Sequence, residues 1–420
     1  MNRRPRPPVA ADLSPANLQR AAQLVAAVTP HAPVEIVLRR ELAPRRDLPE
    51  ADRHALARAV PAFFRWRQWQ DARTPLPRQV AGALDLQARF DADPAAVKIE
   101  TLAARAVPAW IWEELPWAPA SPEAAAWLRQ LQRQPARWLR ARARFAATLP
   151  RALDGCAPAA LPAAAGPTPA TAFRHTGTRD LFLTDEFRHG QFEIQDLASQ
   201  LVGFACAPRP GETWWDACAG EGGKTLHLAD LMANRGLIWA SDRSRRRLLV
   251  LKKRAARAGV FNYRAAFWNG GPHPPTRTRF DGILVDAPCS GVGTWQRHPD
   301  GRWSASPAGV RELAALQLQL LDHVASALKP GGRLVYAVCT LTRSETVAVA
   351  AEFSRRHPEV EPVSVFAEAR GQKAEVSNIQ SEIPHCGPPT PDHCPLTSVY
   401  LRPQDLNANG MFIAAWRRPA

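Results

Sequence analysis

Two cysteines and an aspartate follow two neighbouring apolar runs in the second half of the chain. Asp286 and Cys289 come directly after the run 280–285, and Cys339 closes the run 333–338. Because the carboxyl ends of parallel strands meet at one edge of a sheet, we expect these three side chains to share one crevice. An accessible, electrostatically favoured thiolate is a strong nucleophile. The pattern predicts covalent catalysis, and the alternative is a pair of inert thiols packed as small hydrophobes.

A glycine-rich segment precedes these residues. It runs from Ala217 to Thr225 and joins a predicted strand, ending at Asp216, to a predicted helix. Glycines let a backbone approach a ligand closely, and amides at a helix start attract negative charge. The segment departs from both the Walker pattern and the dinucleotide fingerprint. Asp242 ends the next predicted strand and is followed by Arg247. Asp242 can accept both hydroxyls of a ribose, so the pattern predicts a nucleoside pocket, although a helix cap would also explain this aspartate.

Short strands must position these groups, and from about residue 211 they alternate with helices. We predict strands over 212–216, 237–242, 280–286 and 333–339, with helices over 226–233, 245–258 and 310–328. Such a βαβ series predicts a mostly parallel sheet covered by helices on both faces.

The first half of the chain has a helical pattern instead. Ser14 before Pro15 predicts an N-cap. The stretch 65–69 interleaves arginines with tryptophans. This pattern predicts either a surface that contacts phosphates and stacks on bases, or a helix end with both tryptophans in the core and the arginines in solvent. A second arginine cluster predicts either a phosphate-tracking surface or a solvated basic face: Arg133, Arg137, Arg140, Arg142 and Arg144. The Ala- and Pro-rich stretch 154–172 is predicted to be a linker.

Length, charge and cysteine content narrow the class of protein. A chain of 420 residues predicts two or three packed units. A net charge of +15 favours a polyanionic partner, most simply nucleic acid. No apolar run is long enough to cross a bilayer, so we expect neither membrane insertion nor secretion. Seven cysteines without a secretory signal favour reduced thiols in the cytoplasm.

Residues from about 124 to 418 resemble the NOL/NOP/Sun-domain RNA cytosine-5 methyltransferases. The helical start resembles, more weakly, the antitermination-factor-like domain of the bacterial 16S ribosomal RNA enzymes in that family. Five blocks carry the resemblance in the family's order: Gly190–Asp196 with Ser199–Leu201, Asp216–Thr225, Asp286–Gly291 with Arg297–Asp300, Tyr336–Thr340 with Glu345, and Gly410–Ala414.

The resemblance implies an α/β architecture of three parts. It implies an all-α domain over 1–120, a small α+β RNA-recognition subdomain over 121–205, and a Rossmann-like class I methyltransferase domain with a mixed sheet over 206–420. It also implies S-adenosylmethionine as cofactor, with Asp242 at the ribose and Asp286 near the reacting groups. The cofactor residues expected are Cys218, Ala219, Gly220, Glu221, Gly222, Gly223, Lys224, Asp242, Arg247, Asn269 and Asp286.

Each catalytic role follows from the same resemblance. Cys339 is expected to attack C6 of a flipped-out cytosine, Asp286 to hydrogen-bond the base at N3, and Cys289 to assist release of the product. The chemistry is reasonable, because C5 of cytosine is a poor nucleophile and covalent addition at C6 splits one hard step into easier ones. Some positions depart from the family pattern. Asn269 lies where an aspartate that contacts the adenine side is common, Val338 precedes the nucleophile, and Glu221 and Asn409 replace frequent Pro and Asp.

We therefore expect a monomeric, cytoplasmic RNA cytosine-5 methyltransferase that acts on 16S ribosomal RNA. Transfer RNA is the alternative substrate, and a catalytically silent RNA-binding assembly factor is the alternative function. A DNA cytosine-5 enzyme would place its nucleophile in the Pro-Cys motif at Cys289, and the second cysteine argues against it. We expect no metal, because the four zinc-type side chains of a Pro-rich stretch lack a Cys-x-x-Cys pair: His385, Cys386, His393 and Cys394.

Overall fold

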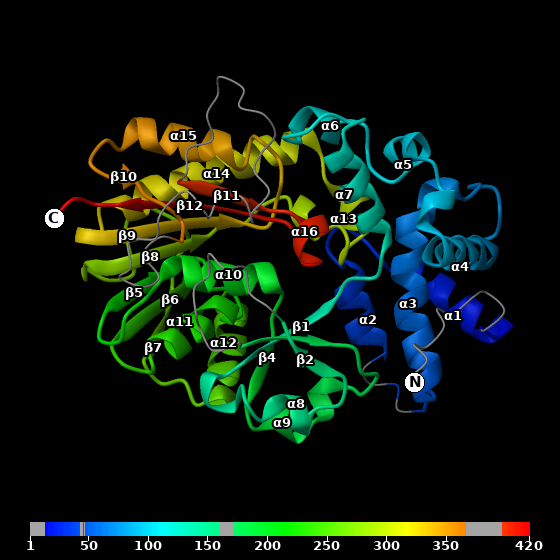
Figure 1. The fold of residues 1–420 in the computed structure, drawn as a ribbon, viewed down its shortest axis with the longest axis horizontal. Helices are drawn as coiled ribbons and strands as arrows, with labels where there is room; N and C mark the ends of the chain where they lie inside the picture. The colour runs from blue at the N-terminus through cyan, green and yellow to red at the C-terminus, as the bar shows by residue number, and fades with distance from the viewer. Residues whose placement is uncertain (1–12, 43–44, 46, 160–170, 367–396) are drawn as a thin grey trace. The chain divides into compact units, whose positions relative to one another are not determined.

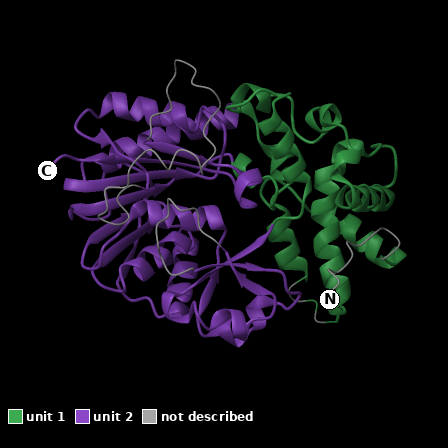
Figure 2. Cartoon of the chain, in the orientation of Figure 1, with its two compact units in different colours: residues 1–135, 291–307 green, residues 136–290, 308–420 purple. Residues whose placement is uncertain are grey.

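The computed structural model describes residues 13–42, 45, 47–159, 171–366 and 397–420. The chain forms two compact units, which Figure 2 colours separately: Met1–Pro135 with Gly291–Pro307 (unit 1), and Ala136–Ser290 with Ala308–Ala420 (unit 2). The segment after Ser290 therefore belongs with the N-terminal helices, although the strands on either side of it belong to unit 2. The boundaries expected near residues 120 and 205 stay a prediction about domains.

Unit 1 is helical, as its sequence pattern predicts. Ser14 caps the first helix, because the backbone N–H of Asn17 donates to its Oγ at 3.2 Å, and Pro15 begins that helix. This confirms the predicted N-cap. The helices are α1 (Pro15–Ala26), α2 (Val34–Leu42), α3 (Glu50–Trp66), α4 (Leu76–Ala92), α5 (Ile99–Arg105), α6 (Ile111–Glu114), α7 (Pro122–Gln132) and α13 (Gly301–Ser304).

The core of unit 1 encloses two arginines, Arg65 and Arg302, and the core alternative for the stretch 65–69 places the first of them in solvent. Trp66 is fully buried and its Nε1–H donates to Gln87, as the core alternative for the stretch 65–69 predicts. Arg65, however, is buried instead of solvated, and burial lowers its pKa to about 10. Arg302 is also buried, and its guanidinium donates to the carbonyls of Ala106, Leu131 and Trp295 and to the side chain of Gln132. These bonds fix the segment 291–307 within unit 1.

Unit 2 is built around a mixed sheet of eight strands. In the order β10-β12-β9-β8-β5-β6-β7, the five strands from β9 to β7 are parallel, and β12 is antiparallel to β9. Its strands are β5 (Thr213–Asp216), β6 (Leu237–Asp242), β7 (Tyr263–Phe267), β8 (Phe280–Asp286), β9 (Leu328–Val338), β10 (Glu361–Pro362), β12 (Met411–Arg417) and β11 (Ser398–Leu401), which pairs with β12.

Helices cover both faces of this sheet. Figure 1 shows α14 and α15 on one side and α10, α11 and α12 on the other. The chain crosses β5 first and then adds strands on either side of it, so the strand order reverses between β5 and β8, where such sheets bind ligands. The bounds are α10 (Leu197–Cys206), α11 (Gly223–Leu231), α12 (Arg245–Ala258), α14 (Pro307–Ala325), α15 (Val347–Arg356) and α16 (Pro403–Leu406).

A small antiparallel sheet precedes this domain and corrects the prediction for two of the five clustered arginines, while Arg133, Arg137 and Arg144 are exposed. Arg140 and Arg142 are buried, and both form ion pairs with Asp230 of α11. They are neither a phosphate-tracking surface nor a solvated face, because β1 packs one side against α10. The elements are β1 (Arg137–Ala141), β2 (Cys156–Pro158), β3 (Ala172–His175) and β4 (Phe192–Ile194) in the order β2-β3-β1-β4, with α8 (Leu149–Ala152) and α9 (Asp185–Arg188).

The expected linker over 154–172 contains β2 and the start of β3, so it is wrong at both ends, and residues 160–170 lie outside the described residues. The zinc-type side chains at 385–394 also lie outside them. In the described part of the chain, no cluster of three or more His, Cys, Asp or Glu side chains could hold a metal ion. None of the described helices is both long and apolar enough to span a bilayer.

Candidate active site

The loop from β5 to α11 is shaped by two left-handed glycines. Gly220 has φ 56° and Gly222, the N-cap of α11, has φ 84°, a region that residues with a Cβ rarely adopt. A Cβ at Gly220 would lie 2.3 Å from the guanidinium of Arg247, and one at Gly223 would meet open space. The loop backbone therefore stays bare, as close approach of a ligand requires.

Asp242 closes this loop from the end of β6. It is 5% exposed, and its carboxylate accepts from the backbone N–H of Gly220 at 2.9 Å and of Ser244 at 2.7 Å. Arg247 lies 3.5 Å from the same carboxylate. A carboxylate has about four acceptor sites, so Asp242 keeps capacity for the hydroxyls of a ribose while it fixes the glycine loop.

Asp216, at the end of β5, carries an unsatisfied buried oxygen. Its Oδ2 accepts from Thr225 at 2.6 Å, whereas Oδ1 has no hydrogen-bond partner among the described residues. Burial raises the pKa of this carboxyl to about 7. The free oxygen lies at the strand end that starts the glycine loop, where it can accept from a bound ligand.

We expect Asp216 to make stability depend on pH. The pKa of this carboxyl rises on folding from 3.8 to about 7. Its contribution to the free energy of unfolding is therefore complete at low pH, where the carboxyl is protonated in both states. That contribution disappears as pH rises to about 7, and its upper limit is about 4 kcal/mol. Asp216→Asn should flatten the dependence of the free energy of unfolding on pH, measured by urea unfolding at pH 5 and pH 8. An unchanged pH slope in the variant would contradict this assignment.

Lys224 and Asp286 form an ion pair across the crevice. The Lys224 Nζ donates to Asp286 Oδ2 at 2.7 Å, and the two residues come from the start of α11 and the end of β8. Burial by itself would lower the pKa of Lys224, but the charge and hydrogen bond of Asp286 raise it above its ordinary value. The lysine is therefore held as a cation beside Asp286.

The two expected catalytic cysteines lie side by side. The Sγ atoms of Cys289 and Cys339 are 3.2 Å apart, and both side chains are partly exposed. Cys289 follows β8 and Cys339 follows β9, which pair in parallel with Asp286 opposite Ala337. The hydrogen bond from Cys289 lowers the pKa of Cys339, with help from the charge of Lys224 and against burial and Asp286. The pKa of the Cys339 thiol therefore lies below that of an ordinary thiol.

A buried glutamate joins the two cysteine loops, and the family resemblance gave it no role. Glu345 is fully buried and accepts from the backbone N–H of Ser290 at 2.8 Å and from its hydroxyl. The same carboxylate accepts from Thr342 at 2.8 Å, Thr340 at 3.3 Å and Gln317 at 3.0 Å. Ser290 follows Cys289 and Thr340 follows Cys339, so one carboxylate fixes the backbone beside both thiols.

The other expected cofactor residues differ in their placement. Cys218 is partly exposed in the loop and burial raises its pKa, while Ala219 is nearly buried. Glu221 is exposed, and its carbonyl accepts from Arg254. Asn269 is exposed and accepts from the backbone N–H of Gly271, and it follows β7, which pairs with β6 so that Phe267 lies opposite Asp242.

These residues fit a cationic nucleoside ligand. Three carboxylates, Asp216, Asp242 and Asp286, stand at the ends of β5, β6 and β8, and one of them has a free buried oxygen. A bare glycine loop lies between them. S-adenosylmethionine carries a ribose, an ammonium group and a sulfonium, which match this set of acceptors.

The sheet order and the glycine loop define a class I methyltransferase, whose cofactor is S-adenosylmethionine. The chain belongs to the 16S rRNA methyltransferase RsmB/F family, whose model matches residues 204–417. This confirms the family resemblance and the fold class that the sequence implies. It also confirms the cofactor.

Relatives and solved structures agree with this assignment. The chain is 39% identical over 181 residues to "Probable ribosomal RNA small subunit methyltransferase B" of Bacillus subtilis, a match that covers 43% of this chain and 40% of that protein. It is 34% identical over 243 residues to "Ribosomal RNA small subunit methyltransferase F" of Cronobacter sakazakii, covering 56% and 47%. These matches therefore span less than half of either relative.

Two crystal structures show the same fold. That of PH0851 has a TM-score of 0.71 at 19% identity and covers 96% of this chain and 99% of its own. A methyltransferase homologue from Pyrococcus horikoshii has a TM-score of 0.53 at 26% identity, covering 71% and 91%.

Proposed function

We propose that the protein transfers a methyl group from S-adenosylmethionine to C5 of a cytosine in RNA, through a transient bond between Cys339 and C6. The observation that carries this proposal is the pair of sulfur atoms 3.2 Å apart at the ends of β8 and β9. A methyltransferase acting on oxygen or on an amine needs no thiol nucleophile. A thiol pair beside a carboxylate suits addition to a pyrimidine ring.

Cys339 is the nucleophile in this proposal. Its thiolate attacks C6, the C5–C6 double bond opens, and the electron pair moves toward C5 and N3. The hydrogen bond from Cys289 lowers the pKa of Cys339, so the thiolate forms nearer neutral pH. The cofactor supplies the electrophilic methyl group that C5 then takes.

Asp286 and Lys224 supply the proton that neutralises the negative charge developing on the base. N3 becomes basic when C6 is attacked, and we assign the proton it takes to the Lys224–Asp286 pair, in which Lys224 donates to the carboxylate. The proton passes from the ammonium through Asp286 to N3 and returns when the ring becomes aromatic again. The pair thus stabilises the adduct without a net change of charge in the site.

Release of the product completes the reaction. The Cys289 sulfur, as a thiolate, takes the C5 proton, the electron pair of the C5–H bond restores the C5–C6 double bond, and the C6–S bond breaks so that Cys339 leaves as a thiolate. We assign Cys289 to this step because its sulfur lies beside the bond that breaks. Free thiols at both positions require a reducing compartment, so the proposal places the reaction in the cytoplasm.

The names of the relatives favour small-subunit ribosomal RNA as the substrate. Bisulfite sequencing of total RNA tests this, since 5-methylcytosine resists conversion. We expect a strain that lacks the gene to lose one or a few methylcytosines in 16S ribosomal RNA, and wild-type protein to restore them. Loss in transfer RNA would move the proposal to that substrate. No loss in any RNA would support a catalytically silent assembly factor.

A further inference from the structure

Helix α12 has an unusual composition for a surface helix. Its 14 residues include seven Lys or Arg and no acidic residue. Three arginines occupy its first turn, where the helix dipole disfavours positive charge. Helix stability therefore does not explain why arginines occupy the first turn of α12.

Four of the seven cations have partners within unit 2. Arg247 pairs with Asp242, and Arg254 and Arg257 pair with Glu193. Arg245 lies over the ring of Phe267 at 4.6 Å. The remaining three form no ion pair with any described residue, and all are exposed: Arg246, Lys252 and Lys253.

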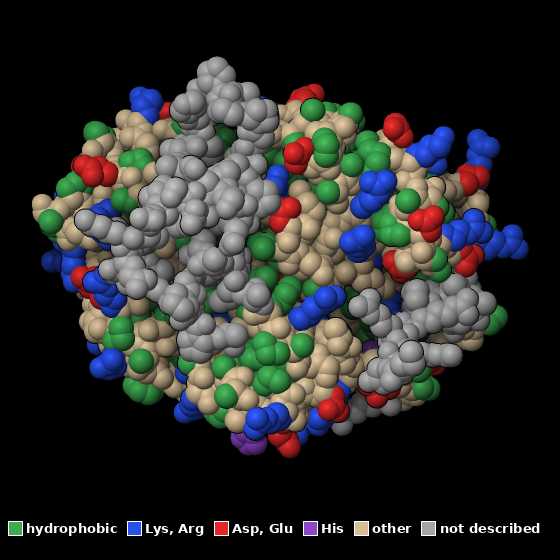
Figure 3. Space-filling model, in the orientation of Figure 1, with side chains coloured by type: hydrophobic (Ala, Val, Ile, Leu, Met, Phe, Trp, Pro, Cys, Tyr) green, Lys and Arg blue, Asp and Glu red, His purple; other side chains and the backbone are tan. Residues whose placement is uncertain are grey.

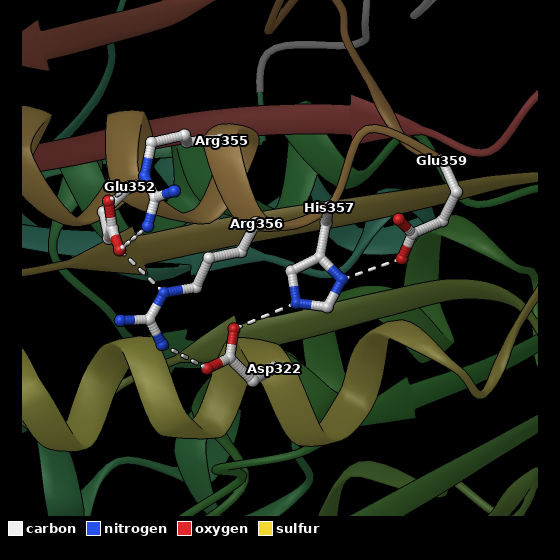
Figure 4. A network of polar contacts seen from close by, with 6 residues as sticks. All are labelled: Asp322, Glu352, Arg355, Arg356, His357 and Glu359. Atoms are coloured by element: carbon white, nitrogen blue, oxygen red, sulfur yellow. Dashed lines mark hydrogen bonds and ion pairs between the residues drawn. The ribbon is translucent and has the colours of Figure 1, made fainter.

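Helix α15 shows the usual arrangement in the same unit. Figure 4 shows Arg355 and Arg356 paired with Glu352, and Arg356 also paired with Asp322. Hydrogen bonds from the two arginines lower the pKa of Glu352 to about 2. On the face that Figure 3 shows, Lys and Arg side chains likewise lie among acidic and apolar ones. The unpaired cations of α12 differ from this pattern.

We infer that Arg246, Lys252 and Lys253 bind phosphates of the substrate RNA. Arg246 and Lys253 lie on one face, seven residues and so about 10.5 Å apart along the helix. Long exposed cations without a shaped pocket suit contact with a phosphate backbone, which is independent of sequence. An acidic protein is a weaker candidate, because α12 exposes a single large apolar side chain, Leu249, and protein interfaces bury an apolar core.

This inference rests on the proposed function, and salt dependence of RNA binding tests it. The wild-type full chain is compared with the variants K252Q/K253Q and R246Q/K252Q/K253Q. The control is R355Q/R356Q on α15, which removes two positive charges, the same number as K252Q/K253Q. The affinity for a 16S ribosomal RNA fragment is measured at several salt concentrations. Each lost phosphate contact should reduce the slope of log affinity against log salt by about 0.7–0.9. The triple variant should lose about 2–3 in slope and bind at least about 100-fold more weakly at 0.1 M salt.

The control variant R355Q/R356Q shows whether a change in salt dependence is specific to α12. R355Q/R356Q should keep the wild-type slope, and all variants should keep the thermal unfolding midpoint and the affinity for S-adenosylmethionine. A wild-type slope in the triple variant, or equal losses in it and in the control, would overturn the inference. A variant that loses binding to a polyglutamate probe but keeps RNA binding would assign the surface to an acidic protein instead. If the wild-type chain neither binds nor methylates RNA, the proposed function itself fails.

Discussion

Cys289→Ala should trap substrate RNA on the protein as a covalent adduct, and Cys339→Ala should form none. Without Cys289 the Cys339 thiolate still attacks C6 and the methyl group is still transferred, but the C6–S bond breaks slowly. The adduct is measured as a band of lower mobility that survives denaturing electrophoresis and disappears after ribonuclease digestion. Turnover should fall at least about 100-fold in both variants, since each loses a group that acts on the reacting bonds.

A shift in pH dependence accompanies the trapped adduct. The hydrogen bond from Cys289 lowers the pKa of Cys339, so Cys289→Ala should raise that pKa toward the usual thiol value. The rate of adduct formation should then require higher pH than the rate of single-turnover methylation in the wild-type protein. Cys206→Ala is the matched control, because that thiol is fully buried in the hydrophobic core and is not open to a base. Reversed behaviour of the two variants would indicate the DNA-type assignment, and no adduct with either would support a silent binder.

Glu345→Ala should reduce single-turnover methyl transfer at least about 100-fold, because misplacement of a reacting group by about 1 Å has effects of that size. The substitution removes the acceptor of five hydrogen bonds, from the backbone and hydroxyl of Ser290 and from the side chains of Gln317, Thr340 and Thr342. The backbones that follow Cys289 and Cys339 then lose their common anchor. Glu345 is fully buried and its carboxylate bonds to the residues that follow the two cysteines, so we assign it a positioning role.

Glu345→Gln separates positioning from general destabilisation. Its amide oxygen can still accept from Ser290, and hydroxyl groups can turn to accept from the amide nitrogen. We expect it to recover most of the rate, whereas Glu345→Ala should lose adduct formation yet keep its affinity for S-adenosylmethionine. Glu352→Gln on α15 is the control and should leave the rate unchanged. Wild-type adduct formation in Glu345→Ala would refute the positioning role.

The sequence by itself determined where the reacting groups stand along the chain. Apolar runs predict β8 and β9, and polar residues after them put Asp286, Cys289 and Cys339 at strand ends. The limits of α12 agree with the predicted helix 245–258, since an N-cap serine and a terminal glycine bound its periodic pattern. These features depend on near neighbours in the chain, so local spacing is enough to find them.

The tertiary structure decided which polar groups meet. Lys224 and Asp286 are 62 residues apart, and Gln317 and Glu345 are 28 apart, and no sequence spacing indicates that they bond. The sequence places Arg140 and Arg142 in a solvated or RNA-binding cluster, yet both pair with Asp230 inside the unit. The segment 291–307 lies between two strands of unit 2 but packs in unit 1 through the buried Arg302.

The reason is physical. Backbone periodicity and caps depend on residues a few positions apart, whereas a buried charge takes whichever acceptor or donor the packing of distant elements brings within hydrogen-bond distance. The strand ends could be predicted because each strand carries its own signal. The partner of each buried charge could not be predicted, because it depends on how the sheet, the helices and the loops pack together.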